Sequence, residues 1–246
     1  MFHRPAILSL SAMLSIALAA CNQNAESAPS ETASSVPSTA QSREDVEKII
    51  RAYMLENPEI IIEALDVLAD RETIEISKDL ASDPRDPRIG ADDAPVTIVE
   101  FFDYNCGYCK SSLDWVMEQA DSGNVQVIMK ELPILSEQSR QAAFAAVAAK
   151  KQGKYLELHQ KMMRQAGNTL TDERIEELAR EIGLNVTRLR KDMESAETLD
   201  YIQDVRDEAR KYGANATPAF FVNGELISGF NKPRLESRIA EIVADN

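Results

Sequence analysis

The stretch that decides the fold predicted here is Phe101-Phe102-Asp103-Tyr104-Asn105-Cys106-Gly107-Tyr108-Cys109-Lys110. The residues leading into it, 96–102 (VTIVEFF), are β-branched and aromatic, and they follow a proline, as at the start of a strand. The residues after it, 111–117 (SSLDWVM), have the apolar spacing of a helix. The two cysteines are therefore predicted to lie where a strand gives way to a helix.

A cysteine at such a junction lies at a helix N-terminus, where unpaired backbone N–H groups and the helix dipole favour an anion. The thiolate is the reactive form of cysteine, and such sites lower its pKa from about 8.5 into roughly the 3.5–7.5 range. We predict that Cys106 is a nucleophile. Cys109, one turn later and less accessible, is predicted to be its resolving partner.

A structural role and a zinc-binding role for the cysteine pair are both weaker. A structural disulfide that closes about four residues would stabilise the fold by only roughly 2 kcal/mol. A zinc site would need two further ligands, but the remaining candidates are Cys21, His3 and His159, which make no Cys/His tetrad. We therefore predict redox chemistry at the pair, with no metal and no cofactor.

The chain has 246 residues, enough for one ordinary domain with attachments. Its formal net charge of −14 argues against nucleic-acid binding, which needs a basic surface.

The N-terminus predicts export. Residues 6–18 form an apolar run that follows a basic residue and is too short to span a bilayer, so 1–20 are predicted to be a signal peptide. Leu18-Ala19-Ala20-Cys21 resembles the lipobox of bacterial lipoprotein precursors, in which the cysteine becomes the acylated lipid anchor. That resemblance implies a protein of the bacterial cell envelope, anchored to a membrane through Cys21 and facing the oxidising periplasm. The alternative is ordinary secretory cleavage near Ala20 with an idle thiol.

Residues 21–42 are rich in Ser, Ala, Thr and Pro and predict a flexible tether. Residues 43–82 predict a helical stalk in two helices, the first capped by Ser42 and the second beginning near Asn57-Pro58. The apolar residues of 59–68 cover an arc of roughly 220°, about twice what a surface helix needs. We expect this segment to self-associate through residues 43–68; docking within the same chain is the alternative.

Residues 83–246 predict the main domain. Asp83–Arg88 has two prolines and alternating charges, which is typical of a linker, and 125–130 predict a second strand. A helical insertion is expected over about 134–213. Its helices are expected at 141–150, 154–165, 172–182, from Asn185 or Thr187 to 193, and 196–212. His159 lies among apolar residues of this insertion and is expected to be structural.

The C-terminal part predicts a hairpin. Ala219–Val222 and Glu225–Ile227 flank Asn-Gly, the strongest short hairpin signal, and Pro218 stands at the first position of a strand, where a sheet tolerates proline. A final helix is expected over 233–243.

This order of elements is similar to an α/β thioredoxin fold with a helical insertion, and within that fold the residues Glu100–Cys109 and Thr217–Gly224 resemble the DsbA-type periplasmic oxidoreductases. The resemblance implies that Pro218 is cis beside the active-site disulfide and that the backbone of Thr217 pairs with substrate peptide. It also implies that Glu100 is a buried acid that moves a proton near Cys109. A solvated glutamate at the strand end is the alternative for Glu100.

The dipeptide Gly107-Tyr108, which we expect to contact substrate, departs from the Pro-His of the DsbA oxidases. Gly-Tyr, with Thr before the proline, resembles the isomerases of this superfamily, and Arg43–Leu68 resembles the N-terminal stalk of ScsC-type proteins, which associate through such helices. We therefore expect thiol–disulfide exchange on exported proteins, leaning toward isomerase or mild oxidoreductase. A monomeric donor oxidase recycled by a membrane redox partner, and a copper- or thiol-binding module without turnover, are the alternatives.

Overall fold

The computed structural model of the protein describes residues 42–245. The predicted signal peptide, the predicted lipid anchor Cys21 and the tether up to residue 41 lie outside these residues. The chain divides into two units, Met1–Tyr53 and Met54–Asn246. Helix α1 (Arg43–Glu56) spans this division. It begins as predicted, because the N–H of Asp45 donates to the Ser42 side chain (3.2 Å).

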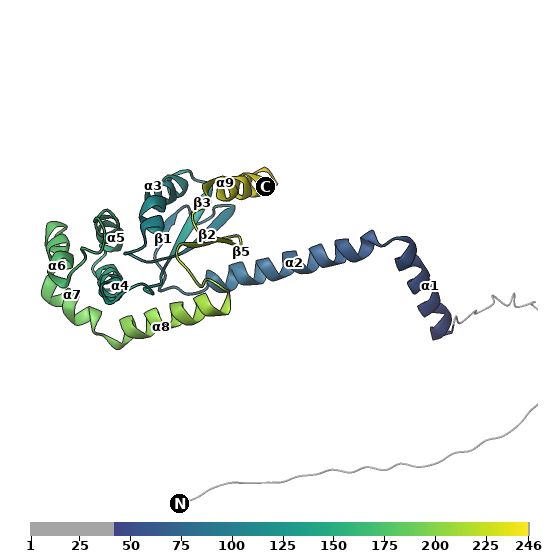
Figure 1. Ribbon diagram of the computed structural model, residues 1–246, viewed down its shortest axis with the longest axis horizontal. Helices are drawn as coiled ribbons and strands as arrows, with labels where there is room; N and C mark the ends of the chain where they lie inside the picture. Colours follow the sequence, from purple (N-terminus) through teal and green to yellow (C-terminus); the bar gives the residue numbers. More distant parts are fainter. Residues whose placement is uncertain (1–41, 246) are drawn as a thin grey trace, which may run out of the picture. The chain divides into compact units, whose positions relative to one another are not determined.

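The second unit contains a five-stranded sheet in the order β1-β3-β2-β4-β5 (Figure 1). Its strands are β1 (Arg88–Gly90), β2 (Val96–Phe102), β3 (Val125–Glu131), β4 (Ala219–Val222) and β5 (Glu225–Ser228). Strands β2 and β3 are parallel, and the other neighbours are antiparallel. A parallel pair needs a crossover, which here is the helix α3 (Gly107–Asp121). The predicted thioredoxin-like arrangement is confirmed.

Helices cover both faces of the sheet, so the strands are buried on both sides (Figure 1). Helices α3 and α9 (Lys232–Ala244) lie on one face, and α8 (Ala196–Lys211) lies on the other. All seven residues of β3 are buried, although alternation in its sequence predicts one polar face. The charged residues of β3 are instead satisfied inside the protein: Lys130 forms ion pairs, and Glu131 accepts hydrogen bonds from tyrosine hydroxyls.

The helical insertion is present as predicted between β3 and β4. It consists of α4 (Glu137–Lys150), α5 (Tyr155–Met163), α6 (Asp172–Glu181), α7 (Val186–Met193) and α8. Helix α4 begins before the expected residue 141 because the Ser136 side chain caps it, accepting from the N–H of Ser139 (3.0 Å).

The expectation that Asp83–Arg88 is an exposed linker is corrected by the structure, because this segment packs into the domain. Asp86 is buried and forms an ion pair with the equally buried Lys130 (2.7 Å), which also pairs with Glu208 (2.7 Å). The hydroxyl of Tyr201 donates to Asp86 (2.9 Å). A buried ammonium needs such partners, so this segment packs into the domain and leads into β1, a strand too short for periodicity to reveal.

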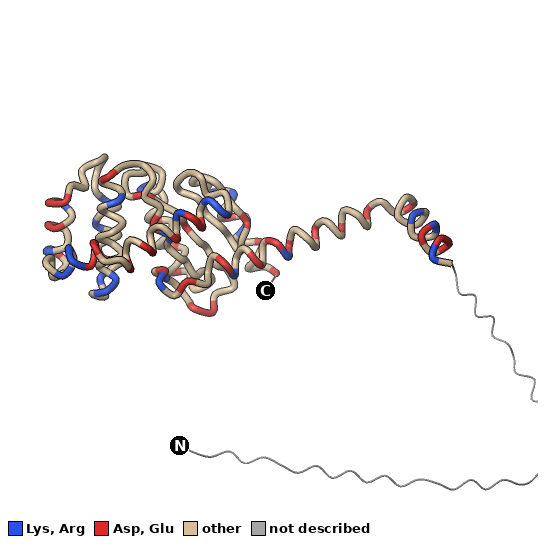
Figure 2. The backbone as a smooth tube through the Cα atoms, turned by 90° about the horizontal axis from the view of Figure 1, so that it is seen from below, with Lys and Arg blue, Asp and Glu red and all other residues tan. Residues whose placement is uncertain are grey.

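The two ends of helix α2 (Glu59–Leu80) differ in how far their side chains are buried. Its C-terminal end packs against the domain: Leu80 is buried, and Asp79 pairs with Lys211 (2.7 Å). Acidic residues recur along its N-terminal half (Figure 2), and most of the apolar side chains between them are exposed. These exposed side chains are Ile61, Ile62, Leu65, Val67 and Leu68. Over residues 42–245, no helix combines the length and apolar character that crossing a membrane requires.

Candidate redox site

Cys106 is the N-cap residue of α3, as the strand-to-helix junction predicted. Its sulfur accepts the N–H of Cys109 (3.4 Å), and its own N–H donates to the backbone carbonyl of Asp103 (3.0 Å). Both cysteines are free thiols. The Cys106 side chain has 7 % of its surface exposed and Cys109 only 1 %, so Cys106 is the more accessible of the two.

The pKa values of the two thiols are shifted in opposite directions, downward for Cys106 and upward for Cys109. Hydrogen bonds from the Cys109 thiol and from the Cys109 backbone lower the pKa of Cys106 to about 6, against the opposing effect of burial. Burial raises the pKa of Cys109 far above its usual range, and the hydrogen bond it gives to Cys106 and the nearby charge of Glu100 add to this. Near neutral pH the pair therefore holds one thiolate, on Cys106, and one thiol, on Cys109.

The Thr217–Pro218 peptide bond is cis and lies beside Cys106. The sulfur of Cys106 lies 3.2 Å from the backbone carbonyl oxygen of Thr217, across 111 positions of sequence, and donates a hydrogen bond to it when the thiol is protonated. This proximity follows from the antiparallel pairing of β2 with β4, which aligns Phe101 with Ala219. The cis bond that the family resemblance implied is confirmed.

Glu100 lies on β2 and faces α3. It is almost wholly buried, and the hydroxyl of Ser112 donates to it (3.1 Å). Burial raises its pKa to about 8. The alternative of a solvated glutamate at the end of the strand is therefore wrong, whereas a role in proton transfer stays a prediction.

Gly107 and Tyr108, the dipeptide between the cysteines, are exposed; Tyr108 has 71 % of its side chain in solvent. Thr217 is partly exposed and Pro218 is buried. The structure thus brings all the predicted redox and substrate residues together, and the substrate-binding role of these four stays a prediction.

Sequence reasoning missed a buried polar cluster next to the redox turn. Glu131 accepts hydrogen bonds from the hydroxyls of Tyr104 (2.9 Å) and Tyr155 (2.8 Å). The Tyr104 hydroxyl also lies 3.0 Å from Nδ1 of His159, and burial lowers the pKa of His159 to about 3. His159 is therefore neutral near pH 7, and its structural role stays a prediction. The one sequence signal for this cluster was a glutamate at the end of an apolar strand.

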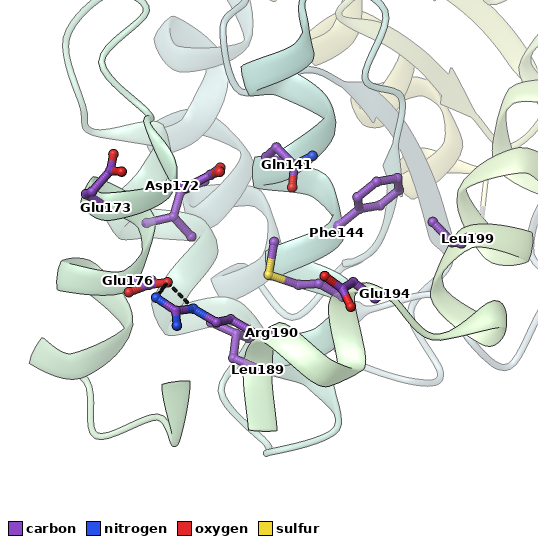
Figure 3. Close-up of a pocket in the computed structure, with 11 residues that line it drawn as sticks. Gln141, Phe144, Asp172, Glu173, Glu176, Leu189, Arg190, Glu194 and Leu199 are labelled. Carbon is purple, nitrogen blue, oxygen red and sulfur yellow. Dashed lines mark hydrogen bonds and ion pairs between the residues drawn. The ribbon is translucent and has the colours of Figure 1, made fainter. Parts of the chain in front are cut away.

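A cavity of about 550 Å³ lies elsewhere, among the helices of the insertion (Figure 3). Acidic side chains of α6, including Asp172 and Glu173, lie at its edge, and Phe144 and Leu189 give it an apolar wall. None of the predicted redox residues lines it. Within the described part of the chain, no cluster of three His, Cys, Asp or Glu residues could hold a metal ion.

Comparison with known proteins agrees with this geometry. Residues 82–241 match a thioredoxin family model, and residues 43–73 match the model of the copper resistance protein ScsC N-terminal domain. A thioredoxin-like oxidoreductase from Silicibacter pomeroyi is 36 % identical, with a TM-score of 0.64 over 69 % of this chain and 98 % of that one. A periplasmic thioredoxin-like protein from Salmonella enterica serovar Typhimurium is 32 % identical, with a TM-score of 0.62 over 69 % and 96 %.

Among curated relatives, the probable disulfide bond formation protein D of Bacillus anthracis is 29 % identical over 151 residues, which are 56 % of this chain and 70 % of that protein. Several Na(+)/H(+) antiporters also match, but over only 22–26 % of their length, which assigns no transport to this chain. The family model covers more than half of the chain and includes both cysteines of the redox site. The chain belongs to the thioredoxin-like thiol–disulfide oxidoreductases.

Proposed function

We propose that this protein is a lipid-anchored disulfide isomerase or mild oxidoreductase that acts on exported proteins in the bacterial periplasm. The observation that carries the proposal is the asymmetry of the cysteine pair. The Cys106 sulfur is acidic, more accessible than its partner and 3.2 Å from the Thr217 carbonyl, whereas Cys109 is buried and stays protonated.

In shuffling, the Cys106 thiolate attacks one sulfur of a wrong substrate disulfide. A mixed disulfide forms, and the other substrate sulfur leaves as a thiolate. That thiolate, or another in the same substrate, attacks a remaining disulfide until a more stable pairing forms. A substrate thiolate then attacks the substrate sulfur of the mixed disulfide, and Cys106 leaves as a thiolate with no net change in oxidation state.

The same residues also carry out net redox steps. When no better pairing forms, Cys109 attacks the sulfur of Cys106, the substrate leaves reduced by two electrons, and the enzyme pair becomes a disulfide. The proton of Cys109 must go to a base as it attacks. Glu100, buried beside it with a pKa of about 8, is our proposed acceptor. Oxidation of a substrate dithiol is the reverse sequence.

Substrate backbone is proposed to pair with Thr217, next to the cis-proline, and to pass over Gly107 and Tyr108. The tyrosine adds no formal charge beside the thiolate, whereas the histidine of a Pro-His dipeptide stabilises it further. Each pKa unit of such stabilisation is about 1.4 kcal/mol, or about 30 mV toward a stronger oxidant. We therefore propose a milder oxidant than the Pro-His enzymes.

A monomeric donor oxidase, recycled by a membrane redox partner, is the second candidate. It is favoured by the relative from Bacillus anthracis, whose name assigns it to disulfide bond formation. The export and lipid-anchor parts of the proposal rest on the N-terminal sequence and on the periplasmic relative from Salmonella. Self-association through residues 43–68 is supported by the exposed apolar side chains there and by the match to the ScsC N-terminal domain.

The test combines a reduction potential with activity on two substrates. We expect the protein to restore activity to scrambled ribonuclease and to have a potential below roughly −120 mV, the value of a strong oxidant. Rapid oxidation of reduced ribonuclease without repair of scrambled ribonuclease would instead assign the donor oxidase function. Stoichiometric Cu(I) binding with neither activity would contradict both.

A further inference from the structure

The cavity among the helices of the insertion is separate from the redox site, and the proposed function gives it no role (Figure 3). Its volume of about 550 Å³ lies within the range of pockets that bind small organic molecules. Helices α4, α6, α7 and α8 all contribute side chains to it. Its shape is therefore set by packed helices rather than by a single loop.

The wall of the cavity is apolar. Ile175 and Leu189 are buried behind it, and Leu199 has 44 % of its surface in solvent. Aromatic, aliphatic and thioether side chains pack well against apolar groups of a ligand. A ligand that fills this space therefore needs an apolar body. The apolar side chains that line the cavity are Phe144, Ile175, Leu189, Met193 and Leu199.

The charged side chains that line the cavity are mostly acidic. Those of Asp172, Glu173, Glu176 and Glu194 carry carboxyl groups, and that of Arg190 is the one guanidinium among them. Arg190 is already paired with Glu176, as the dashed lines in Figure 3 show. Over residues 42–245, neither Asp172 nor Glu194 forms an ion pair or a side-chain hydrogen bond. These two carboxylates are therefore open to a cation on a ligand.

The position of Glu194 has no explanation in the stability of its helix. Asp172 and Glu173 lie in the first turn of α6, where the helix dipole favours acidic residues, so the fold alone accounts for them. Glu194 is the C-cap residue of α7, where the dipole disfavours a carboxylate. Within the described part of the chain, no cationic side chain pairs with it to offset this cost. A cation bound in the cavity would supply that partner.

We propose that this cavity binds a small organic cation, an ammonium group on an apolar body. The apolar body packs against the wall beside Phe144 and Met193, and the ammonium group pairs with Asp172 and Glu194 at the edge. Eleven residues line the cavity, whereas a specific protein interface uses about 20–30 residues on each side, so its size favours a small molecule. The inference goes beyond the proposed function and does not depend on it, because no redox residue lines the cavity.

The first test compares three probes that share one apolar body and differ in charge. Biphenylbutylammonium, biphenylbutanol and biphenylbutanoate are titrated into the full chain, and binding is measured by calorimetry. We expect the ammonium to bind at least about 5-fold more tightly than the alcohol, the effect of two exposed ion pairs, and the carboxylate to bind most weakly. Added salt should reduce the advantage of the ammonium. No binding of the ammonium, or equal or tighter binding of either other probe, would overturn the proposal.

The second test removes the two carboxylates. Asp172→Asn combined with Glu194→Gln keeps the size of both side chains, and we expect ammonium affinity to fall by about 5-fold and alcohol affinity to stay within about 2-fold. Glu118→Gln combined with Asp121→Asn is the matched control, because both residues are exposed on α3 and neither lines the cavity. It should keep the wild-type affinity for every probe. Equal losses in the two double variants would indicate general charge attraction and overturn the site.

The third test changes the apolar wall without entering the core. Leu199→Ser alters an exposed side chain, and we expect the ammonium and the alcohol both to bind about 3-fold more weakly. Unchanged affinity for both probes would contradict the site. Saturating ammonium should leave the alkylation rate of Cys106 by iodoacetamide within about 2-fold of its value without ligand. A larger fall would place the ligand at the redox site and overturn the inference, whatever the outcome for the proposed function.

Discussion

The two sulfurs of the redox site differ because the backbone presents them differently. Cys106 caps α3, so N–H groups of the first turn point at its sulfur and favour the thiolate. Cys109 lies one turn further on, inside the core, where no comparable set of donors compensates the loss of water. The different positions of the two cysteines in the first turn of α3 thus produce one nucleophile and one protonated partner.

A pH profile tests this difference. The alkylation rate of the reduced protein by iodoacetamide should rise with pH and reach half of its plateau near pH 6, because the ionised fraction of Cys106 grows as the pH passes its pKa. In the urea-unfolded protein the midpoint should move to about 8.5. Cys109→Ala removes the largest cause of the low pKa, so its midpoint should lie above that of the wild type. A native midpoint above pH 8 would contradict the proposed nucleophile.

Glu100 permits a second test at this scale. Because its pKa is about 8, it is mostly protonated at pH 7 and can both give and take a proton near neutrality. Glu100→Gln should slow the attack of Cys109 on a mixed disulfide by about 10²-fold, the usual contribution of general acid–base catalysis. Quenched-flow measurement of mixed-disulfide decay gives this rate. The alkylation rate of Cys106 is the control and should change little; an unchanged decay rate would remove Glu100 from the mechanism.

Among the elements, the β4–β5 hairpin connects the redox site to helix α2. One end of β4 carries the cis-proline next to Cys106, and the turn at its other end packs against α2. Gly224 in that turn has φ +91°, and a Cβ there would overlap the backbone carbonyl of Thr73 on α2. Only glycine fits both conditions.

Gly224→Ala should therefore destabilise the protein more than backbone strain alone explains. Gly229→Ala is the matched control, since Gly229 also has a positive φ (+74°) but has no atom within 4 Å of the new Cβ. Strain alone costs about 1–2 kcal/mol. We expect the control to lose about that much free energy of unfolding in urea titration, and Gly224→Ala to lose at least about 1 kcal/mol more. Equal losses would mean that α2 does not pack against the hairpin.

At the scale of the whole molecule, the second unit has a buried apolar core, but the first half of its helix α2 lies outside that core and leaves its apolar side chains largely exposed. Five apolar side chains are exposed there, Ile61, Ile62, Leu65, Val67 and Leu68, and the proposed self-association would cover them. A shuffling enzyme has a further reason to associate, because several thiolates held together can act on one misfolded substrate.

Solution mass tests this association. Ile62→Glu combined with Leu65→Glu places charges at two of the exposed positions without touching the core. We expect the wild type to have a multiple of the single-chain mass in sedimentation equilibrium, and the double variant to have the single-chain mass with its reaction toward glutathione disulfide unchanged. Leu199→Glu, exposed on α8, should keep the wild-type mass. A wild type that sediments as a single chain would contradict self-association.

The sequence by itself predicted the elements of this protein except the three-residue strand β1, and it singled out the cysteine pair of the redox site. Strand, Cys-x-x-Cys and helix, the five helices of the insertion and the Asn223-Gly224 hairpin all follow from periodicity and turn chemistry, which depend only on near neighbours in the chain. Only the tertiary structure decided how polar residues are used, because burial and hydrogen bonding depend on what packs from elsewhere. The tertiary structure brings the Thr217 carbonyl oxygen next to the Cys106 sulfur and buries Glu100. It also pairs Asp86 with Lys130 in a segment where the local pattern predicts a linker. It also gathered four donors from three segments around Asp103, an arrangement that no local pattern records.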